Sequence, residues 1–437
     1  MSSIEIGLWS FPVLILLIFL RVPIAAAMLG TGIVGTFLVL DRWVPILSQL
    51  KSVAWTTNVN YSLSIIPLFL LMGQFAARGG MSQALFNAAA AFLGHRKGGV
   101  AMAAVGACAG FGSICGSSLA TAATMAQVAL PELKRHGYSG GLSTATLAAG
   151  GTLGILIPPS VVLVIYAILA EQNIAKLFLA AFVPGIIAAI SYLTVIAIYV
   201  RLKPESAGQA PRVPWGERLP ALIAVWPVVT IFFLVVGGIY LGWFTPTQAA
   251  AVGAASAGLV AWKNGGLDRA SLLACFKETA VSTGMIFFIV LGATVFNSFL
   301  AFSRLPQMGA EWVTAQGFAP MTVLIIILVL YIIFGCIMDS LSMIVLTIPI
   351  FFPIVTAMDF GLTPEQFAIW FGILVLMVAE IGMITPPVGL NLFIISAMAR
   401  DVPVRETYKG ILPFVTADLL RIILLTAFPI ISIFLIT

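Results

Sequence analysis

Long apolar segments follow one another along almost the whole chain, separated by short breaks that contain charged residues, Pro or Gly. A helix of roughly 20 apolar residues is long enough to cross the hydrocarbon layer of a membrane. The segments lack the ten-residue alternation of barrel strands, so we expect helices. The breaks predict crossings at residues 4–20, 24–40, 62–77, 142–171, 175–200, 219–241, 246–262, 271–300, 366–399 and 409–436. This pattern predicts an all-α integral membrane protein.

Two further apolar stretches, residues 98–131 and 319–354, are each interrupted near the middle by a small polar sequence, GFGSICGSS and FGCIMDSLS. Each stretch predicts a re-entrant helical hairpin, whose two short helices enter and leave on the same side. If the N-terminus is periplasmic and neither hairpin crosses, most of the 21 Lys and Arg residues lie in cytoplasmic loops, as the positive-inside rule favours. The exceptions are Arg42, Lys51, Lys176, Arg304 and, within a crossing, Arg421. Both termini are therefore predicted to be periplasmic.

Composition agrees with this class, because 61% of the 437 residues are hydrophobic and only 8% are charged. A water-soluble fold would lack the polar residues to cover its surface, so the lipid bilayer is a predicted partner. The net charge of +5 is explained by cytoplasmic loops, and we expect no nucleic-acid partner. The four cysteines all lie in apolar segments without a CxxC pair, which favours packing roles over disulfides or metal ligation.

The two halves of the chain share a spaced pattern of Gly and Pro. Four positions match at an offset of 223, namely Pro23, Gly30, Gly35 and Gly112 with Pro246, Gly253, Gly258 and Gly335. Three more match at an offset of 228, namely Gly154, Pro158 and Pro159 with Gly382, Pro386 and Pro387. Each half would hold five crossings, an odd number, so the second half is inverted relative to the first, as in secondary transporters. We predict a first repeat at 1–201, a cytoplasmic linker at 202–218 and a second repeat at 219–437.

A double proline interrupts one apolar segment in each half, within GGTLGILIPPS and EIGMITPPVGLN. Two prolines end a helix and free backbone carbonyls, which survive at membrane depth where they line a cavity. There the carbonyls can bind a cation, while a helix N-terminus faces an anion. The breaks predict broken helices at 142–171 and 366–399, with candidate residues Gly151, Thr152, Gly154, Gly382 and Thr385. The alternative is a proline kink that only shapes packing.

The hairpin tips supply oxygen ligands near these breaks. The candidates are Ser113, Ser117, Ser118 and Thr121 in the first tip and Asp339, Ser340 and Ser342 in the second. Hard cations such as sodium prefer oxygen ligands, and helix starts attract carboxylates. Serines also join helices inside membranes, so each has a packing alternative.

Acidic residues among apolar neighbours are costly and often functional, which makes Asp339 and Glu380 candidates. Asp418 and Arg421 lie three residues apart on the last predicted helix, where they can form a structural ion pair. Sequence motifs for ATP hydrolysis, zinc proteases and serine hydrolases are missing, so we expect neither an enzyme nor an organic cofactor.

Several of these segments resemble one known family. FGSICGSSLATAAT, ALPELKRHGYS, GGTLGILIPPS, LFLAAFVPG and EIGMITPPVGLNLF are similar to the large membrane subunit of tripartite ATP-independent periplasmic (TRAP) transporters. The resemblance covers nearly the whole chain. One departure is Cys115, where the family more often has serine.

The resemblance implies a sodium-driven secondary importer of the bacterial inner membrane that carries organic acid anions, including four-carbon dicarboxylates and sialic acids, by an elevator movement. It implies two partners, a periplasmic substrate-binding protein and a small four-helix membrane subunit, here a separate chain. Sodium would be the coupling ion, bound by Ser113, Ser117, Ser118, Gly151, Thr152, Gly154, Gly335, Asp339, Ser340, Gly382 and Thr385. The solute would contact Thr121, Pro158, Pro159, Ser342, Pro386, Pro387 and Asn391. The competing interpretation is a channel or uniporter without sodium coupling.

Overall fold

The computed structural model describes residues 2–436, and within that range every regular element is a helix. The prediction of an all-α membrane protein is confirmed. Six helices are long and apolar enough to cross a membrane: Tyr61–Arg78, Ile174–Leu202, Trp215–Tyr240, Arg269–Ser303, Pro364–Met383 and Val404–Ala427. A seventh span is formed by Gly140–Leu156 and Val161–Leu169, which are bent by 46° at the first double proline.

The first half contains ten α-helices and two 3₁₀ turns. They are α1 (Ser3–Phe19), α2 (Ile24–Leu40), α3 (Trp43–Val59), η1 (Tyr61–Ser64), α4 (Ile65–Arg78), α5 (Met81–Leu93), α6 (Gly99–Cys115), α7 (Ser118–Arg135), α8 (Gly140–Leu156), α9 (Val161–Leu169), α10 (Ile174–Leu202) and η2 (Pro204–Ser206).

The second half is divided differently. Its helices are α11 (Trp215–Ile223), α12 (Trp226–Phe232), η3 (Phe233–Gly237), α13 (Gly238–Tyr240), α14 (Pro246–Lys263), α15 (Arg269–Ser303), α16 (Leu305–Ala315), α17 (Pro320–Gly335), α18 (Ser340–Thr356), α19 (Pro364–Met383), α20 (Leu390–Met398), α21 (Val404–Ala427) and α22 (Ile430–Ile433). Its first apolar segment is split into α11, α12, η3 and α13, while α15 is one long helix.

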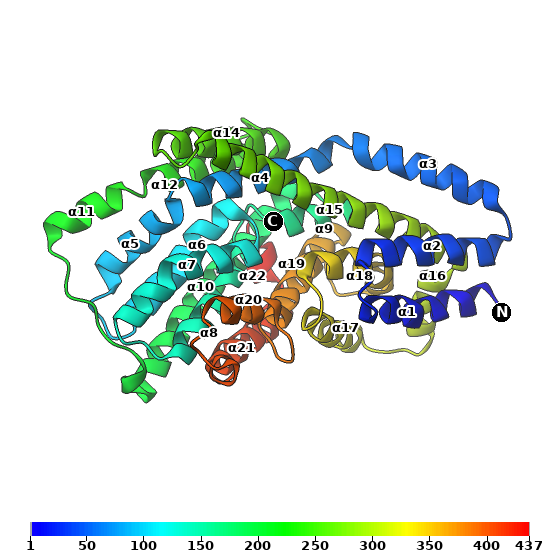
Figure 1. Ribbon diagram of the computed structural model, residues 1–437. Helices are drawn as coiled ribbons and strands as arrows, with labels where there is room; N and C mark the ends of the chain where they lie inside the picture. Colours follow the sequence, from blue (N-terminus) through cyan, green and yellow to red (C-terminus); the bar gives the residue numbers. More distant parts are fainter. Residues whose placement is uncertain (1, 437) are drawn as a thin grey trace.

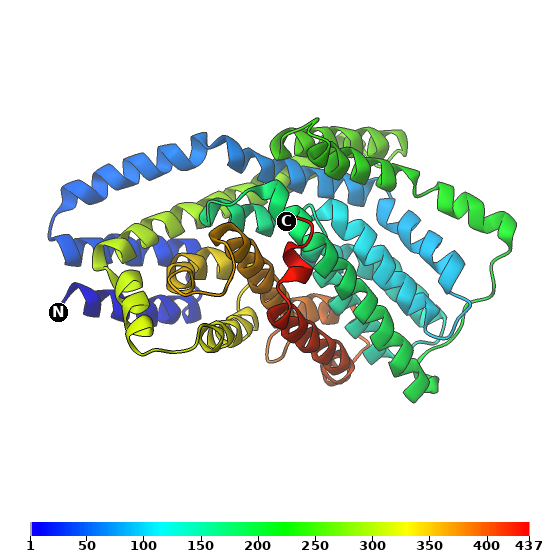
Figure 2. The same ribbon diagram turned by 180° about the vertical axis from the view of Figure 1, so that it is seen from behind.

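The molecule is elongated, and helices of the two halves pack against each other (Figure 1). The outer helices of one half pack on outer helices of the other half. Helix α2 packs on α15, and α4 packs on α14. Seen from both sides, α3 and α15 run along one long edge, α1 and α2 lie at one end, and α5 and α11 lie at the other (Figures 1 and 2). The helices around the two double prolines occupy the middle of the molecule.

Helices α3, α5 and α16 are absent from the predicted set of crossings. Helices α5 and α16 contain 13 and 11 residues and are too short for a crossing, whereas α3 has 17 residues but includes Gln49, Lys51 and Asn58. These three helices are therefore not recognisable as long apolar segments in the sequence. Helix α15 has 35 residues and is continuous. At the offset of 223 it corresponds to α3 and α4 together, which are separated at Asn60.

Helix α11 begins at Trp215, within the range 202–218 that the sequence predicts as a polar linker. Arg218 of this helix is buried, with its guanidinium carbon 4.8 Å from the ring centroid of Trp215 and 5.7 Å from that of Phe92. Its Nε also donates a hydrogen bond to the carbonyl of Val213 at 2.9 Å. These contacts fasten the linker to α5.

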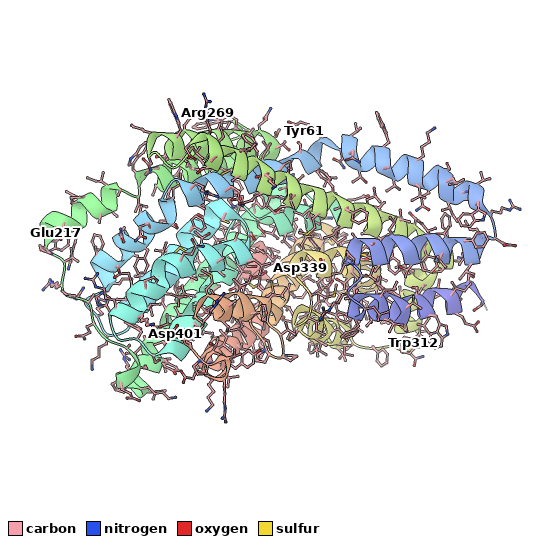
Figure 3. All side chains as sticks on the ribbon, in the orientation of Figure 1. Tyr61, Glu217, Arg269, Trp312, Asp339 and Asp401 are labelled. Carbon is pink, nitrogen blue, oxygen red and sulfur yellow. The ribbon has the colours of Figure 1, made fainter. Side chains whose placement is uncertain are left out.

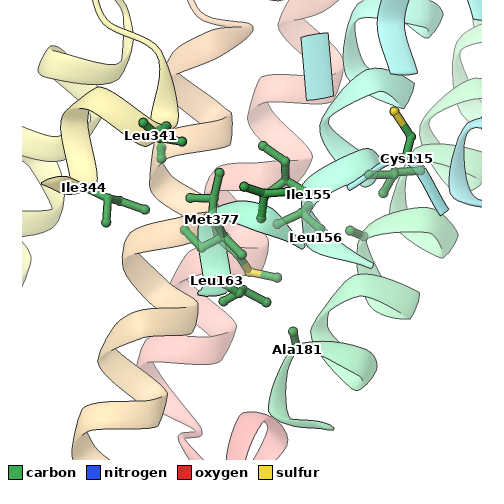
Figure 4. Packing of buried hydrophobic residues seen from close by; sticks show 14 of the residues in the cluster. Cys115, Ile155, Leu156, Leu163, Ala181, Leu341, Ile344 and Met377 are labelled. Carbon is green, nitrogen blue, oxygen red and sulfur yellow. The ribbon is translucent and has the colours of Figure 1, made fainter. Parts of the chain in front are cut away.

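The core lies where the two broken helices meet. Helix α19 is almost wholly buried, and so is α8 on the first-half side. Figure 4 shows Ile155 and Leu156 beside Met377 of α19, with Leu341 of α18 to one side and Cys115 to the other. The middle of the molecule therefore joins both hairpins and both breaks in one packed unit.

Candidate functional site

Each hairpin turns at a polar tip that also starts a helix. Helix α6 ends at Gly116, which has a positive φ of 65°, and the Ser117 hydroxyl then accepts a hydrogen bond from Ala120 N at 3.4 Å. In the second hairpin, the Asp339 carboxylate accepts a hydrogen bond from Ser342 N at 3.1 Å. Short polar side chains are preferred at such N-caps because they satisfy free backbone N–H groups. Both tips thus present a helix N-terminus.

Each double proline separates two helices, as the sequence predicts. The Pro158–Pro159 and Pro386–Pro387 peptide bonds are both cis. Ser160 caps α9 by accepting from Leu163 N at 3.4 Å, whereas α20 follows Gly389, which has a φ of 59°. The second break therefore needs glycine where the first uses a side-chain cap.

The first helix of each hairpin contacts its broken helix through a pair of glycines. A Cβ atom on Gly112 would lie 2.5 Å from the Cα of Gly154, and one on Gly382 would lie 2.5 Å from the carbonyl carbon of Gly335. Any side chain at these positions would collide with backbone, so the contacts depend on glycine. All four residues belong to the Gly pattern that relates the two halves.

The tips also contact the breaks. A Cβ atom on Gly116 would lie 3.1 Å from the carbonyl oxygen of Pro159, and Gly389 N donates a hydrogen bond to the carbonyl of Cys336 at 3.2 Å. The first tip also touches the second half, because the Ser118 hydroxyl lies 3.6 Å from Met383 Sδ at the end of α19. Each tip therefore touches the break of its own half, and the first tip also contacts the end of α19.

A cavity of about 630 Å³ opens onto this region. Five predicted site residues line it, namely Ser117, Ser118, Asp339, Ser340 and Ser342. Asp339 is half-buried and lies near the middle of the molecule in Figure 3. The structure thus brings the two hairpin tips together on the wall of a single cavity.

The other predicted site residues do not line this cavity. They are Ser113, Thr121, Gly151, Thr152, Gly154, Pro158, Pro159, Gly335, Gly382, Thr385, Pro386, Pro387 and Asn391. Ser113 and Thr385 use their hydroxyls within their own segments, donating to the carbonyls of Gly110 at 2.8 Å and Ile381 at 2.6 Å. Thr121 Oγ1 and Asn391 Oδ1 are buried and make no hydrogen bond within residues 2–436.

Thr152 belongs to a buried chain of polar contacts that ends on the last long helix. Its hydroxyl lies 2.9 Å from Tyr192 Oη, which donates a hydrogen bond to Asp418 Oδ2 at 2.8 Å. Asp418 Oδ1 pairs with Arg421 Nη1 at 2.9 Å, so the expected ion pair is present. A buried pair of this kind keeps its charges compensated away from water. The chain links the first broken helix to α10 and α21.

Glu380 is only 1% exposed, and neither carboxylate oxygen makes a hydrogen bond in the described part of the chain. The hydroxyls of Ser118 and Ser340, one from each hairpin tip, lie close enough to interact with it. A lone carboxylate at membrane depth is costly, so Glu380 remains a functional candidate. It stands behind the cavity wall, one turn before the second break.

The outer helices and the turn between α1 and α2 contribute three polar cavity residues that the sequence analysis does not predict: Arg21, Gln74 and Ser282. Arg21 falls in a charged loop of the predicted topology, and Gln74 and Ser282 lie inside predicted crossings. In the sequence, each of them is only a polar residue in or beside an apolar segment. Such a residue does not indicate that its side chain lies at the cavity. Tertiary packing brings them to the site.

The fold and the cavity define a multi-pass membrane protein with the architecture of a transporter. The chain belongs to the DctM family, because residues 11–431 match the family model described as "Tripartite ATP-independent periplasmic transporter, DctM component". The resemblance seen in the sequence motifs is therefore confirmed.

Three relatives indicate the range of the family. The C4-dicarboxylate TRAP transporter large permease protein of Pseudomonas aeruginosa is 39% identical over 380 residues, 86% of each chain. The ectoine TRAP transporter large permease protein of Halomonas elongata is 32% identical over 86% of each chain. The isethionate TRAP transporter permease protein DctMQ of Oleidesulfovibrio alaskensis is 31% identical over 94% of this chain and 64% of its own length. All three are named as transporter permeases, not as enzymes.

A solved structure has the same fold. The YdaH transporter of Alcanivorax borkumensis superposes with a TM-score of 0.61 over 86% of this chain and 87% of that chain, at 15% sequence identity.

Proposed function

We propose that this chain is the large permease subunit of a sodium-coupled importer for an organic acid anion such as a dicarboxylate. The observation that carries the proposal is the convergence of helix starts on the cavity. The first residues of α2, α7, α9 and α18, which are Ile24, Ser118, Val161 and Ser340, all line it. Helix N-termini carry partial positive charge and free N–H groups, so four together favour an anion.

Sodium would bind at the junction of each tip with its break. The first site would use oxygens of Ser113, Ser117, Ser118, Gly151, Thr152 and Gly154, and the second those of Gly335, Asp339, Ser340, Gly382 and Thr385. The close Gly112–Gly154 and Gly335–Gly382 contacts support this assignment, because they hold each tip against the carbonyls that a proline break leaves free. Sodium bound beside Asp339 would offset the one acidic side chain on the cavity wall.

The two hairpins and two broken helices would move as one body past the outer helices, carrying solute and sodium between the two faces of a bacterial inner membrane. The exchange of outer-helix partners between the halves supports a static frame, since α2 with α15 and α4 with α14 tie the repeats together. We place both termini in the periplasm. The expected partners are a periplasmic binding protein that delivers the solute and a small membrane subunit. One relative is named DctMQ, so that subunit can also occur fused.

The decisive experiment is uptake into proteoliposomes that contain this chain, its small subunit and its binding protein. Radiolabelled succinate, isethionate and ectoine would be offered with and without an inward sodium gradient. The proposal expects uptake of succinate or isethionate that needs both the gradient and the binding protein, and ectoine, a zwitterion without net charge, is the comparison. Uptake that needs neither would indicate the alternative, a channel or uniporter, and would overturn the proposal.

A further inference from the structure

Arg21 occupies an unusual backbone position at the rim of the cavity. It follows α1 with a φ of 65°, a conformation that side-chain-bearing residues seldom adopt. Two backbone hydrogen bonds hold it there, from Arg21 N to Ile18 O at 2.9 Å and from Val22 N to Leu17 O at 3.0 Å. Pro23 then directs the chain into α2. The arginine is thus placed by a fixed turn between two outer helices.

Among residues 2–436, Arg21 is also the only Lys or Arg that lines the cavity. Its side chain is exposed and takes part in none of the ion pairs within residues 2–436. Within residues 2–436, the one acid on the wall is Asp339 at the second hairpin tip, and the other two polar residues from the outer helices, Gln74 and Ser282, are neutral. The cavity therefore holds a guanidinium group without a protein carboxylate bound to it.

We propose that Arg21 binds the carboxylate or sulfonate group of the solute when the cavity is open on the Arg21 side. This inference rests on the proposed function. A guanidinium group presents paired N–H donors that match two oxygens of an oxyanion. The nearby start of α2 adds partial positive charge to the same place.

The second half lacks an equivalent of this arginine. The offset of 223 places Phe244 at the corresponding position, just before Thr245 and Pro246 at the start of α14. Phe244 packs toward Gly238, where a Cβ atom would lie 2.6 Å from its ring. In an inverted repeat, the start of α14 would face the site in the opposite state. Arg21 would thus hold the anion in one state only, giving the two faces unequal affinity.

The test compares wild type with Arg21→Gln, Arg21→Lys and a matched control, Arg42→Gln, whose arginine is exposed and lies outside the cavity. The probe is whichever of succinate, isethionate and ectoine the wild type takes up with sodium. Arg21→Gln should raise the KM for this probe on the Arg21 face about tenfold, as expected for a lost charge-assisted hydrogen bond. The KM of Arg21→Lys should lie between those of wild type and Arg21→Gln, and the KM of Arg42→Gln should equal that of wild type.

The same proteoliposomes distinguish a failure of the role proposed for Arg21 from a failure of the proposed importer function. Right-side-out and inside-out preparations give KM on each face, and Arg21→Gln should make the two values more alike while leaving the sodium dependence unchanged. A KM within twofold of wild type on both faces would overturn the role of Arg21 and leave the importer intact. Absence of sodium-driven uptake in wild type would overturn the proposed function, and this inference with it.

Discussion

A Cβ atom on Gly73 would lie 3.3 Å from Sγ of Cys115, so the outer helix α4 touches the tip of the first hairpin. Both residues line the cavity. This contact lies between the outer frame and the inner helices, and it must break if the inner helices move as one body. Cys115 is a free cysteine and provides a native thiol for testing the movement.

Gly73→Cys should form a disulfide with Cys115 under oxidation, because the facing atoms are within reach of a normal bridge. The crosslinked protein should lose nearly all uptake and recover it after reduction. Solute uptake before and after dithiothreitol provides the measurement.

Two controls make this result specific. Gly73→Ala tests whether the added Cβ alone disturbs the tip, whose backbone lies 3.2 Å away at the Cys115 carbonyl oxygen. Gly73→Cys combined with Cys115→Ser should transport in both redox states. Full uptake from completely crosslinked protein would contradict the moving-body mechanism.

Gly112→Ala should destabilise the protein by several kcal/mol, since its methyl group would overlap the Gly154 backbone, and overpacking alone costs about 1–3 kcal/mol. Gly106→Ala is a matched control on the same helix, because a Cβ there meets nothing within 4 Å. Thermal unfolding in detergent should separate the two variants clearly. Equal Tm values would mean that the hairpin does not approach the broken helix this closely.

Ser118→Ala and Thr385→Ala should each lower the apparent sodium affinity about tenfold while leaving the fold intact, because each removes one ligand oxygen from a proposed site. Uptake as a function of sodium concentration measures this. Thr356→Ala is a suitable control, since its hydroxyl is exposed and bonds only to the carbonyls of Phe352 and Pro353. If the sodium dependence of uptake is unchanged in both Ser118→Ala and Thr385→Ala, these two residues are not sodium ligands.

The sequence predicts the parts of the site that rest on local chemistry. A double proline must end a helix, and a serine or aspartate after a glycine-rich turn makes a good N-cap, so residue order alone is enough to locate the breaks and the tips. Arg21 and Gln74 cannot be found in this way, because each reaches the cavity through packing between distant segments, and the same holds for the contact of Tyr192 with Thr152. Helices α3, α5 and α16 are missed for another reason, since α5 and α16 are short and the sequence of α3 is interrupted by polar residues such as Gln49 and Lys51.

Asp401 lies in the loop before α21 and accepts a hydrogen bond from Lys134 Nζ at 2.5 Å. This bond holds the pKa of Asp401 below its ordinary value. A lowered pKa means that the pair stabilises the fold above the usual aspartate pKa of about 3.9 and that this contribution disappears as the pH falls below that value. Both side chains are exposed, so the contribution is small.

For this reason, Asp401→Asn should change Tm only slightly at pH 7, and the difference from wild type should shrink as the pH is lowered through about 4. Asp359→Asn, at another exposed loop, serves as a control without an ion pair among residues 2–436. A Tm difference that grows with acidity would contradict the sign derived from the Lys134 contact.

Tyr192→Phe removes one hydroxyl from the chain that links Thr152 to Asp418. The ring still packs against Phe414, but Asp418 Oδ2 loses its donor, and a buried unsatisfied acceptor costs about 1–3 kcal/mol. We expect a lower Tm and, if Thr152 is a sodium ligand, a weaker apparent sodium affinity. Tyr199→Phe on the same helix should change neither value, because the Tyr199 hydroxyl makes no hydrogen bond within the described residues and its ring contact with Lys203 survives. A lower Tm with unchanged sodium dependence would make the chain purely structural, whereas a change in both would make Tyr192 and Asp418 positioning residues for the first sodium site.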